Sequence, residues 1–282
     1  MSASLLDYLK SGSLYFLPHH AISRIVFKLT RIESTLVPKA ISLFSKAFNV
    51  DLKEAKYPDP RYYKTFNEFF TRELKMGSRP IANTKITSPV DGTISQLGKV
   101  IEGKILQAKG IDYSLNQLLG GKIERSKQFN NGQFITIYLS PRDYHRIHMP
   151  CDGKLLEQIH IPGRLFSVAK HTVRTIKGIF ARNERVVAMF ETEYGPMAMV
   201  LVGAINVAAI ETVWDGLITP PKGKTITDKD FSDQDISLVK GEEMGRFNMG
   251  STVILVFADG APNLGSTLQE DQGLKLGEAL SA

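Results

Sequence analysis

The chain has 282 residues, of which 43% are apolar and 23% charged, a composition that supports a buried core and excludes a disordered or collagen-like chain. Its 35 Lys and Arg residues exceed the 29 Asp and Glu residues, which gives a net charge of +6. This mild excess favours anionic surfaces without requiring nucleic acid, so we expect no nucleic-acid partner. The single cysteine, Cys151, cannot form a disulfide within the chain.

Residues 1–75 are predicted to be helical, because apolar side chains recur there at three- and four-residue spacing. Pro18 and Pro38 separate the helices, while Thr65 and Glu68 form a capping pattern that begins a further helix reaching about Leu74. The apolar positions are Leu5, Leu6, Leu9, Ile22, Ile25, Val26, Leu29, Ile41, Leu43, Phe44 and Phe48.

The N-terminal 50 residues hold six basic and two acidic side chains, and therefore +4 of the net charge of +6. Apolar stripes opposite Lys and Arg are typical of helices that lie in the headgroup region of an anionic membrane. A helical subdomain packed on the rest of the protein explains the same pattern. We expect no membrane-spanning helix, which needs ~20 apolar residues, and no secretory signal.

After Lys85 the sequence changes to short β-rich runs separated by Gly and Pro, with a Tyr194-Gly195-Pro196 turn predicted to join two strands. No alternating βαβ pattern occurs, so the predicted fold class is α+β, with N-terminal amphipathic helices followed by a mainly antiparallel, sandwich- or barrel-like β core. We expect a membrane-associating region at 1–75 and a β-rich catalytic domain at 76–282. The predicted strands are 93–97, 104–108, 133–139, 154–161, 186–191, 197–213 and 251–257.

Two histidines, His145 and His148, follow the apolar strand that ends at Leu139, a position where functional sites often form. Asp91 precedes a glycine in a turn, and an Asp-Gly turn taken alone is usually structural. His145, His148 and Cys151 follow one another at three-residue intervals, a spacing that metal ligands can have. A closed zinc site needs further ligands that no second Cys/His pair supplies, so we expect no metal.

The Gly250-Ser251 peptide stands at the start of an apolar strand. Glycine has no Cβ, so a neighbouring hydroxyl can approach its carbonyl carbon and the backbone can tolerate strain. A serine in this position could attack the bond on its own amino side.

Five segments, 64–70, 138–150, 180–186, 210–214 and 245–252, resemble those of the pyruvoyl-dependent, bacterial-type phosphatidylserine decarboxylases, and they occur in the same order. The resemblance runs from the basic N-terminus to about residue 260. A single tripeptide would be weak evidence, but five motifs in one order are not.

The self-cleavage motif of that family is usually Leu-Gly-Ser-Thr, which occurs here at 264–267. Ser266 lies in a polar tail, without a preceding Gly-Arg-Phe or a following apolar strand. Residues 249–252, Met-Gly-Ser-Thr, have both. The resemblance therefore implies cleavage between Gly250 and Ser251, which leaves chains of 250 and 32 residues.

The resemblance also implies roles for individual residues. Asp91, His148 and Ser251 would form a charge relay in which His148 takes the proton of the serine hydroxyl. Cleavage, elimination and hydrolysis would convert Ser251 into a pyruvoyl group, so no external cofactor is expected. His145 would be the acid of the decarboxylation step.

The implied activity converts phosphatidylserine to phosphatidylethanolamine and carbon dioxide through a Schiff base with the pyruvoyl group, which serves as electron sink. Tyr138 and Phe166 would line the headgroup or acyl entrance. The implied partners are phosphatidylserine, an anionic membrane surface, the two chains of the cleaved protein and a second copy in a homodimer. The implied location is peripheral, on the cytoplasmic face of the bacterial inner membrane.

Two other readings use the same residues. One is a Ser-His-Asp esterase with an intact Ser251, and the other is a membrane-associated β scaffold without catalysis. If the N-terminal helices serve only to bind membranes, deletion of residues 2–48 should abolish vesicle binding and leave self-cleavage intact.

Overall fold

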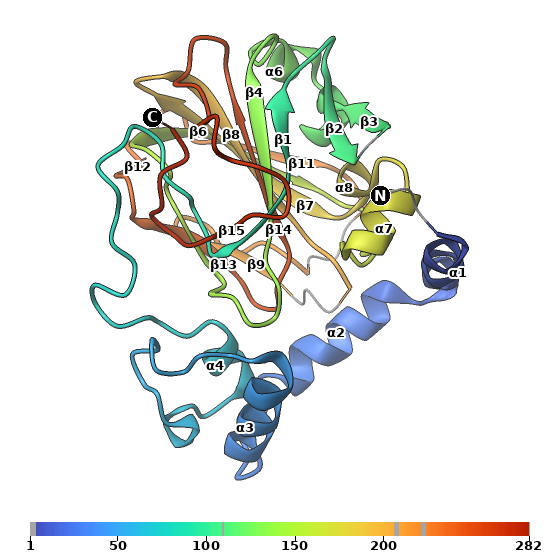
Figure 1. Cartoon of the computed structure of the whole chain (residues 1–282), viewed down its shortest axis with the longest axis vertical. Helices are drawn as coiled ribbons and strands as arrows, with labels where there is room; N and C mark the ends of the chain where they lie inside the picture. Colours follow the sequence, from blue (N-terminus) through green and yellow to red (C-terminus); the bar gives the residue numbers. More distant parts are fainter. Residues whose placement is uncertain (1–3, 109, 206–208, 221–223, 282) are drawn as a thin grey trace.

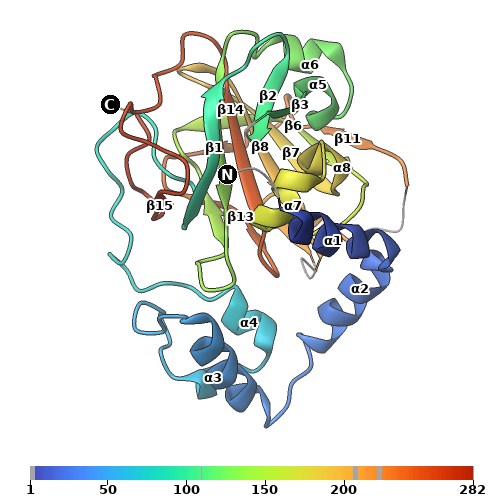
Figure 2. The same ribbon diagram turned by 45° about the vertical axis from the view of Figure 1, so that its right-hand side comes forward.

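The structure of the protein is a computed structural model that describes residues 4–108, 110–205, 209–220 and 224–281. A β-rich body carries the helices of the N-terminal region as an arm that begins beside α7 and leads to α3 and α4 at one end of the body (Figures 1 and 2). The N-terminal elements are α1 (Leu5–Ser13), η1 (Leu14–Phe16), α2 (His19–Leu29), α3 (Val37–Phe48), η2 (Pro60–Tyr62) and α4 (Phe66–Phe70).

The helix boundaries follow local capping chemistry. Pro18 is the N-cap of α2, and Pro38 lies in the first turn of α3, where its missing N–H needs no partner. Thr65 begins α4 as predicted, since its hydroxyl accepts the Glu68 N–H at 3.1 Å. The helix ends at Phe70 rather than near Leu74, because Leu74 is extended and pairs with Ala55 in a β-bridge.

The β-rich body contains a nine-stranded sheet with the order β11-β6-β7-β8-β14-β4-β1-β15, and β12 also pairs with β6. Every pairing in it is antiparallel, which confirms the predicted α+β class. The sheet does not close into a barrel, because among the described strands β11 and β15 each have only one neighbour. The strands are β1 (Gly92–Lys99), β4 (Gln133–Tyr138), β6 (Gly153–Ile161), β7 (Arg185–Thr192), β8 (Gly195–Val202), β11 (Thr227–Asp230), β12 (Ser237–Leu238), β14 (Thr252–Phe257) and β15 (Gly273–Leu274).

Smaller elements complete the body. A four-stranded sheet has the order β10-β9-β13-β5, and β2 pairs with β3. The bounds are β2 (Lys104–Ala108), β3 (Ile111–Ser114), β5 (Arg146–His148), β9 (Ile210–Thr212), β10 (Gly216–Leu217), β13 (Glu243–Phe247), α5 (Leu115–Leu118), α6 (Ile123–Lys127), α7 (Lys170–Thr175) and α8 (Ile179–Arg182).

Two expectations about strand ends were wrong. The predicted strand 197–213 is two strands, β8 and β9, and its residues 206–208 lie outside the described residues. The turn between β7 and β8 lies at 193–194, because Thr192 already pairs with Gly195. Pro196 is therefore inside β8, where it faces Glu191 across the hairpin.

Two apolar cores meet just before β14. All six residues of β14 are buried between β4 and β8, with Thr252 opposite Tyr138 on one side. The second core belongs to the N-terminal region, and Met249 packs against it. The Gly250-Ser251 peptide thus lies at the junction of the two cores. The buried members of the second core are Val37, Ile41, Val50, Tyr63, Phe69 and Phe70.

None of the described helices is both long enough and apolar enough to cross a membrane.

Candidate active site

Ser251 is buried at the entry to β14, with 1% of its surface exposed. Its carbonyl accepts a hydrogen bond from the Leu139 N–H at 2.7 Å, which fixes the backbone beside the end of β4. Its hydroxyl has no hydrogen-bond partner among the described residues. Four other buried hydroxyls of the described residues also lack a partner, so it is the position of Ser251 next to Gly250 that marks this serine as a candidate reactive group.

Gly250 lies directly against His145. A Cβ built on Gly250 would be 2.8 Å from the His145 Nε2 atom, which is too close for any residue other than glycine unless His145 moves. His145 is fully buried, its ring lies 4.1 Å from that of Phe70, and neither ring nitrogen has a hydrogen-bond partner among the described side chains and backbone groups. Burial, aided by the Arg72 cation, lowers the pKa of His145 to about 3. The ring next to the predicted cleavage bond is therefore neutral at pH 7.

His148 lies at the end of β5, beside the turn that carries Asp91. Its backbone N–H donates to the Pro89 carbonyl at 2.9 Å. Its Nδ1 is 2.8 Å from the Gly241 carbonyl and its Nε2 is 3.1 Å from the Tyr144 hydroxyl. Because a carbonyl only accepts, Nδ1 carries the proton and Nε2 accepts from Tyr144. Burial lowers the pKa of His148, so this ring is neutral as well.

Asp91 is buried and held by cations. Its carboxylate accepts from the Arg79 Nε at 2.8 Å, from the Arg79 Nη2 at 2.6 Å and from the Leu276 N–H at 2.8 Å. The Lys275 ammonium lies 3.4 Å away. Burial by itself would raise the pKa of Asp91, but the Arg79 and Leu276 hydrogen bonds outweigh it and the pKa is lowered.

The predicted charge-relay residues lie in neighbouring segments but not in hydrogen-bond contact. Both ring nitrogens of His148 have other partners, the Asp91 carboxylate is bound by Arg79, and the Ser251 hydroxyl is unpartnered within the part of the chain that the structure describes. The histidine nearest to the Gly250-Ser251 bond is His145. Assembly of the trio from this arrangement therefore requires side chains to rotate.

A cavity of about 200 Å³ opens onto Ser251 and Gly250. Phe44 and Phe48 of α3 line one part of its wall, and Tyr138 of β4 lines another. The N-terminal helices thus supply part of the surface around the candidate reactive serine. Tyr138 thus lies beside Ser251, and its role at the headgroup or acyl entrance stays a prediction.

Phe166, which was expected to line the entrance, lies elsewhere. Its side chain is fully buried and lines neither the Ser251 cavity nor the larger one beside it. Its ring packs against Tyr15 and His19 at centroid distances of 4.9 and 5.2 Å, and Arg182 stacks over it. Phe166 therefore joins the N-terminal helices to the β-rich body instead of contacting the cavity.

Ser266, in the second Leu-Gly-Ser-Thr string, is exposed in a turn. It lacks the close backbone packing that surrounds Gly250 and Ser251.

Comparison with known proteins gives a consistent result. Residues 66–282 match the phosphatidylserine decarboxylase family. The chain is 49% identical over 278 residues to the phosphatidylserine decarboxylase proenzyme of Vibrio vulnificus strain YJ016, covering 96% of this chain and 98% of the relative. It is 54% identical over 260 residues to that of Pseudoalteromonas translucida, covering 90% of each, and 50% identical over 283 residues to that of Shewanella putrefaciens, covering 98% of each.

The chain belongs to the phosphatidylserine decarboxylase family. The resemblance of the five motifs is thereby confirmed at the level of the family. The arrangement of Ser251, His145, His148 and Asp91 is the candidate active site of this member of the phosphatidylserine decarboxylases.

Sequence reasoning missed several residues of this phosphatidylserine decarboxylase site. Arg79 binds Asp91, Tyr144 binds a nitrogen of His148, and Phe70 stacks on His145. Tyr144 directly precedes His145 in the same motif and could have been noted for that reason. Arg79 and Phe70 carried no local signal, because their contacts join segments that only the fold brings together. No group of three or more His, Cys, Asp or Glu residues in the described ranges is arranged to hold a metal ion.

Proposed function

We propose that this chain decarboxylates phosphatidylserine to phosphatidylethanolamine and carbon dioxide, and that it makes the necessary pyruvoyl group by cleaving its own Gly250-Ser251 bond. The observation that carries the proposal is the buried, unpartnered hydroxyl of Ser251 beside a glycine that no other residue can replace without moving His145. The relatives named phosphatidylserine decarboxylase proenzyme support the activity, and the word proenzyme is consistent with processing.

The cleavage chemistry uses only the chain and water. The Ser251 oxygen attacks the Gly250 carbonyl carbon, so that a carbon–oxygen ester bond forms and the carbon–nitrogen amide bond breaks, with the hydroxyl proton passing to the nitrogen. Removal of the Ser251 α-proton then expels the Gly250 carboxylate and leaves dehydroalanine at position 251. Water replaces its nitrogen, which leaves as ammonia, and a ketone remains at the new N-terminus.

We assign the proton acceptor of the first step to His148, with Asp91 as its orienting partner. A neutral ring is required for this role, and burial keeps His148 neutral at pH 7. The ring must exchange its Tyr144 hydrogen bond for one to Ser251 and its Gly241 hydrogen bond for one to Asp91, which stays ionised through Arg79. Burial raises the pKa of the Tyr144 phenol, so that Tyr144 remains a hydrogen-bond donor throughout.

The residues around Ser251 suit the group that would form there. The position is buried, its side chain has no competing partner among the described residues, and a cavity of about 200 Å³ adjoins it. A pyruvoyl ketone supplies an electron sink for the electrons released when carbon dioxide leaves. His145 can hold a proton given up by the substrate ammonium on Nε2 and return it to the carbon that loses carbon dioxide.

The substrate is a bilayer lipid, and we propose that the N-terminal helices bind the membrane surface peripherally, on the side of the inner membrane that faces the cytoplasm. Large apolar side chains are exposed there, including Phe16 at 90%, Leu5 at 78% and Leu43 at 71%. Isolated exposed leucines are common on proteins, but a series along three successive helices that also carry basic residues favours a lipid surface.

Intact mass spectrometry of three purified proteins tests the cleavage proposal. The unaltered sequence and Ser266→Ala should each give two chains separated at 250/251, whereas Ser251→Ala should give one continuous chain without decarboxylase activity. Reduction with borohydride in the presence of phosphatidylserine should attach the lipid amine to the shorter chain. If the unaltered protein is an active enzyme but remains one continuous chain with an intact Ser251, the esterase is favoured and the proposal is refuted. If Ser251→Ala has the same chain mass and the same activity as the unaltered protein, the non-catalytic scaffold is favoured and the proposal is likewise refuted.

A further inference from the structure

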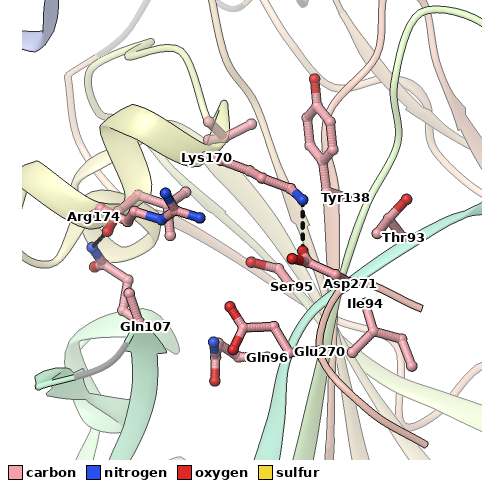
Figure 3. Close-up of a pocket in the computed structure, with 13 residues that line it drawn as sticks. Thr93, Ile94, Ser95, Gln96, Gln107, Tyr138, Lys170, Arg174, Glu270 and Asp271 are labelled. Atoms are coloured by element: carbon pink, nitrogen blue, oxygen red, sulfur yellow. Dashed lines mark hydrogen bonds and ion pairs between the residues drawn. The ribbon is translucent and has the colours of Figure 1, made fainter. Parts of the chain in front are cut away.

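A larger cavity of about 700 Å³ adjoins the Ser251 cavity, and the two share Tyr138 and Val168 in their walls. Figure 3 shows side chains around it from β1, from β2 and β4 (Gln107 and Tyr138), from the α7 segment and from the turn before β15. The last of these belongs to the C-terminal chain that cleavage at Ser251 would release. The larger cavity therefore has room for a part of the substrate that does not fit in the Ser251 cavity.

The wall of the larger cavity offers polar groups that the protein leaves unused. Thr93, Ser95 and Gln96 on β1 contribute two hydroxyls and an amide, and Tyr138 contributes a phenol. Within the described residues, none of these side chains makes a hydrogen bond. Gln96 is nevertheless buried, at 7% exposure. The other three side chains are half-buried, so all four offer hydrogen-bonding groups to a polar occupant of the cavity.

The wall of the larger cavity carries two cations, Lys170 and Arg174, and two carboxylates, Glu270 and Asp271. Lys170 is paired with Asp271 at 2.7 Å, and both side chains are more than half exposed (Figure 3). Arg174, one helical turn further along α7, and Glu270 have no ion-pair partner in the described ranges. A guanidinium with its donors free, facing a cavity lined with hydroxyls, is suited to a phosphate oxyanion.

The helix that carries Arg174 also packs against the N-terminal arm. The Thr175 hydroxyl of α7 donates to Ser11 of α1 at 2.6 Å. Helix α1 exposes Leu5 and Leu6 to solvent. A lipid held at a membrane surface by α1 would therefore present its headgroup close to α7.

We propose that this cavity binds the phosphate ester of the substrate headgroup, with Arg174 as the principal contact and the β1 hydroxyls as additional donors. The inference rests on the proposed function, because it places the phosphate next to the cavity where the substrate amine must reach position 251. A lipid headgroup and a free phosphate compound could both supply the phosphate group that this cavity binds. The experiment below distinguishes these two ligands.

The first measurement does not depend on activity. Glycerophosphoserine binding is measured by calorimetry on the uncleaved Ser251→Ala chain and on the same chain with Arg174→Gln, Arg174→Lys or Arg164→Gln. Arg174→Gln should weaken binding about tenfold or more, and Arg174→Lys should weaken it less, because lysine keeps the charge but loses the planar fork. Arg164 is exposed and lines neither cavity, so Arg164→Gln should bind normally. Equal binding by the Arg174 variants would overturn the proposal.

The second measurement uses the cleaved enzyme and a short-chain phosphatidylserine. Arg174→Gln should raise KM about tenfold with kcat nearly unchanged, since the residue holds the phosphate and not the reacting atoms. If inorganic phosphate binds as tightly as glycerophosphoserine while KM for the lipid is unaffected by Arg174→Gln, the cavity binds free phosphate and the headgroup assignment is refuted. If the unaltered enzyme does not decarboxylate phosphatidylserine, the proposed function fails, and the calorimetry still decides whether Arg174 binds the ester.

Discussion

The Arg31 Nη2 donates to the Asn248 Oδ1 at 2.8 Å, and this contact joins the end of helix α2 to the residue two positions before Gly250. The same oxygen accepts from the Asn67 Nδ2 at 2.9 Å, and the Asn67 N–H donates to the Thr30 carbonyl at 2.8 Å. The Arg31 guanidinium also stacks on a neighbouring ring, that of Phe27, 3.6 Å from its centroid. The N-terminal helices therefore hold the segment that leads into the predicted cleavage site.

This contact predicts that the N-terminal helices assist self-cleavage as well as membrane binding. A hydrogen bond to a charged group contributes about 1.5–3 kcal/mol, so Asn248→Leu or Arg31→Gln should slow cleavage roughly 10- to 100-fold in a pulse-chase of newly made protein without membranes. The exposed Arg24 of the same helix provides the control, Arg24→Gln, which should cleave normally.

Deletion of residues 2–48 should likewise impair cleavage, contrary to the expectation from sequence alone. That expectation treated the helices as a separate membrane anchor, because no sequence pattern indicates that Phe44, Phe48 and Arg31 contact the region around Ser251. Cleavage of the deleted protein at the normal rate would show that the contacts with Asn248 are merely structural.

The two histidines should separate cleavage from decarboxylation. His148→Ala should slow self-cleavage by about 10²-fold or more, the usual effect of losing a general base. His145→Ala should still cleave, but the cleaved protein should decarboxylate phosphatidylserine at least about 10²-fold more slowly. Gel analysis of the chains and release of labelled carbon dioxide measure the two steps. Failure of His145→Ala to cleave, with normal cleavage of His148→Ala, would assign the base role to His145, the ring that lies against Gly250.

Much of the fold was predictable from short-range patterns. The β-rich runs located the main strands, and Pro18, Pro38 and Thr65 marked where helices begin, because both features depend on residues a few positions apart. The limits of the prediction also have physical causes. Phe166 is covered by α2, and helix α4 ends early because Leu74 pairs with Ala55. Both outcomes depend on packing between segments far apart in sequence.

For the candidate site, too, short-range motifs were informative and contacts between distant segments were not predictable. Sequence motifs predicted roles for Asp91, both histidines and Ser251, but carried no information about which of these groups are in contact. The partners of Asp91 come from residues 79, 275 and 276, which only the folded chain assembles. Spacing also could not tell which histidine lies beside Gly250.

Arg79 should stabilise the protein in a pH-dependent manner. Arg79 and Asp91 form a pair whose side chains are 8% and 2% exposed, and removal of one partner from a buried pair costs about 3–5 kcal/mol. We expect Arg79→Gln to lower the free energy of unfolding by this amount at pH 7, measured by urea titration in the uncleaved Ser251→Ala background. Arg61→Gln removes an exposed pair with Asp59 and should cost less than about 1 kcal/mol.

The sign of the pH effect follows from the pKa of Asp91. In the unaltered protein this pKa is lowered, so the stability that Asp91 provides is complete above its unfolded pKa of about 3.9 and is lost as the pH falls from there through the lower pKa of the folded state. Without Arg79, burial dominates and raises the pKa above the unfolded value. The variant then regains stability as Asp91 becomes protonated, and the difference from the unaltered protein should shrink between pH 7 and pH 4. An equal difference at both pH values would contradict this account of Asp91.

Membrane binding should depend on the exposed apolar side chains of the N-terminal helices independently of cleavage. Burial of one large apolar side chain contributes about 1.5–3 kcal/mol, so Phe16→Ser should weaken sedimentation with anionic vesicles roughly tenfold or more, and Phe16→Ser with Leu43→Ser should weaken it further. Both residues are exposed, at 90% and 71%, and no hydrogen bond of the Asn248 segment involves them. Self-cleavage should therefore proceed normally in the double variant.

Met76 supplies the matched control, since it is fully exposed but lies after α4, outside the helical arm. Met76→Ser should bind vesicles like the unaltered protein. If the double variant sediments normally, or if Met76→Ser loses as much binding as Phe16→Ser, the arm is not the membrane-binding surface. The exposed leucines of α1 and α3 would then need another partner, and the headgroup of a bilayer lipid would have to reach Ser251 by a different face of the molecule.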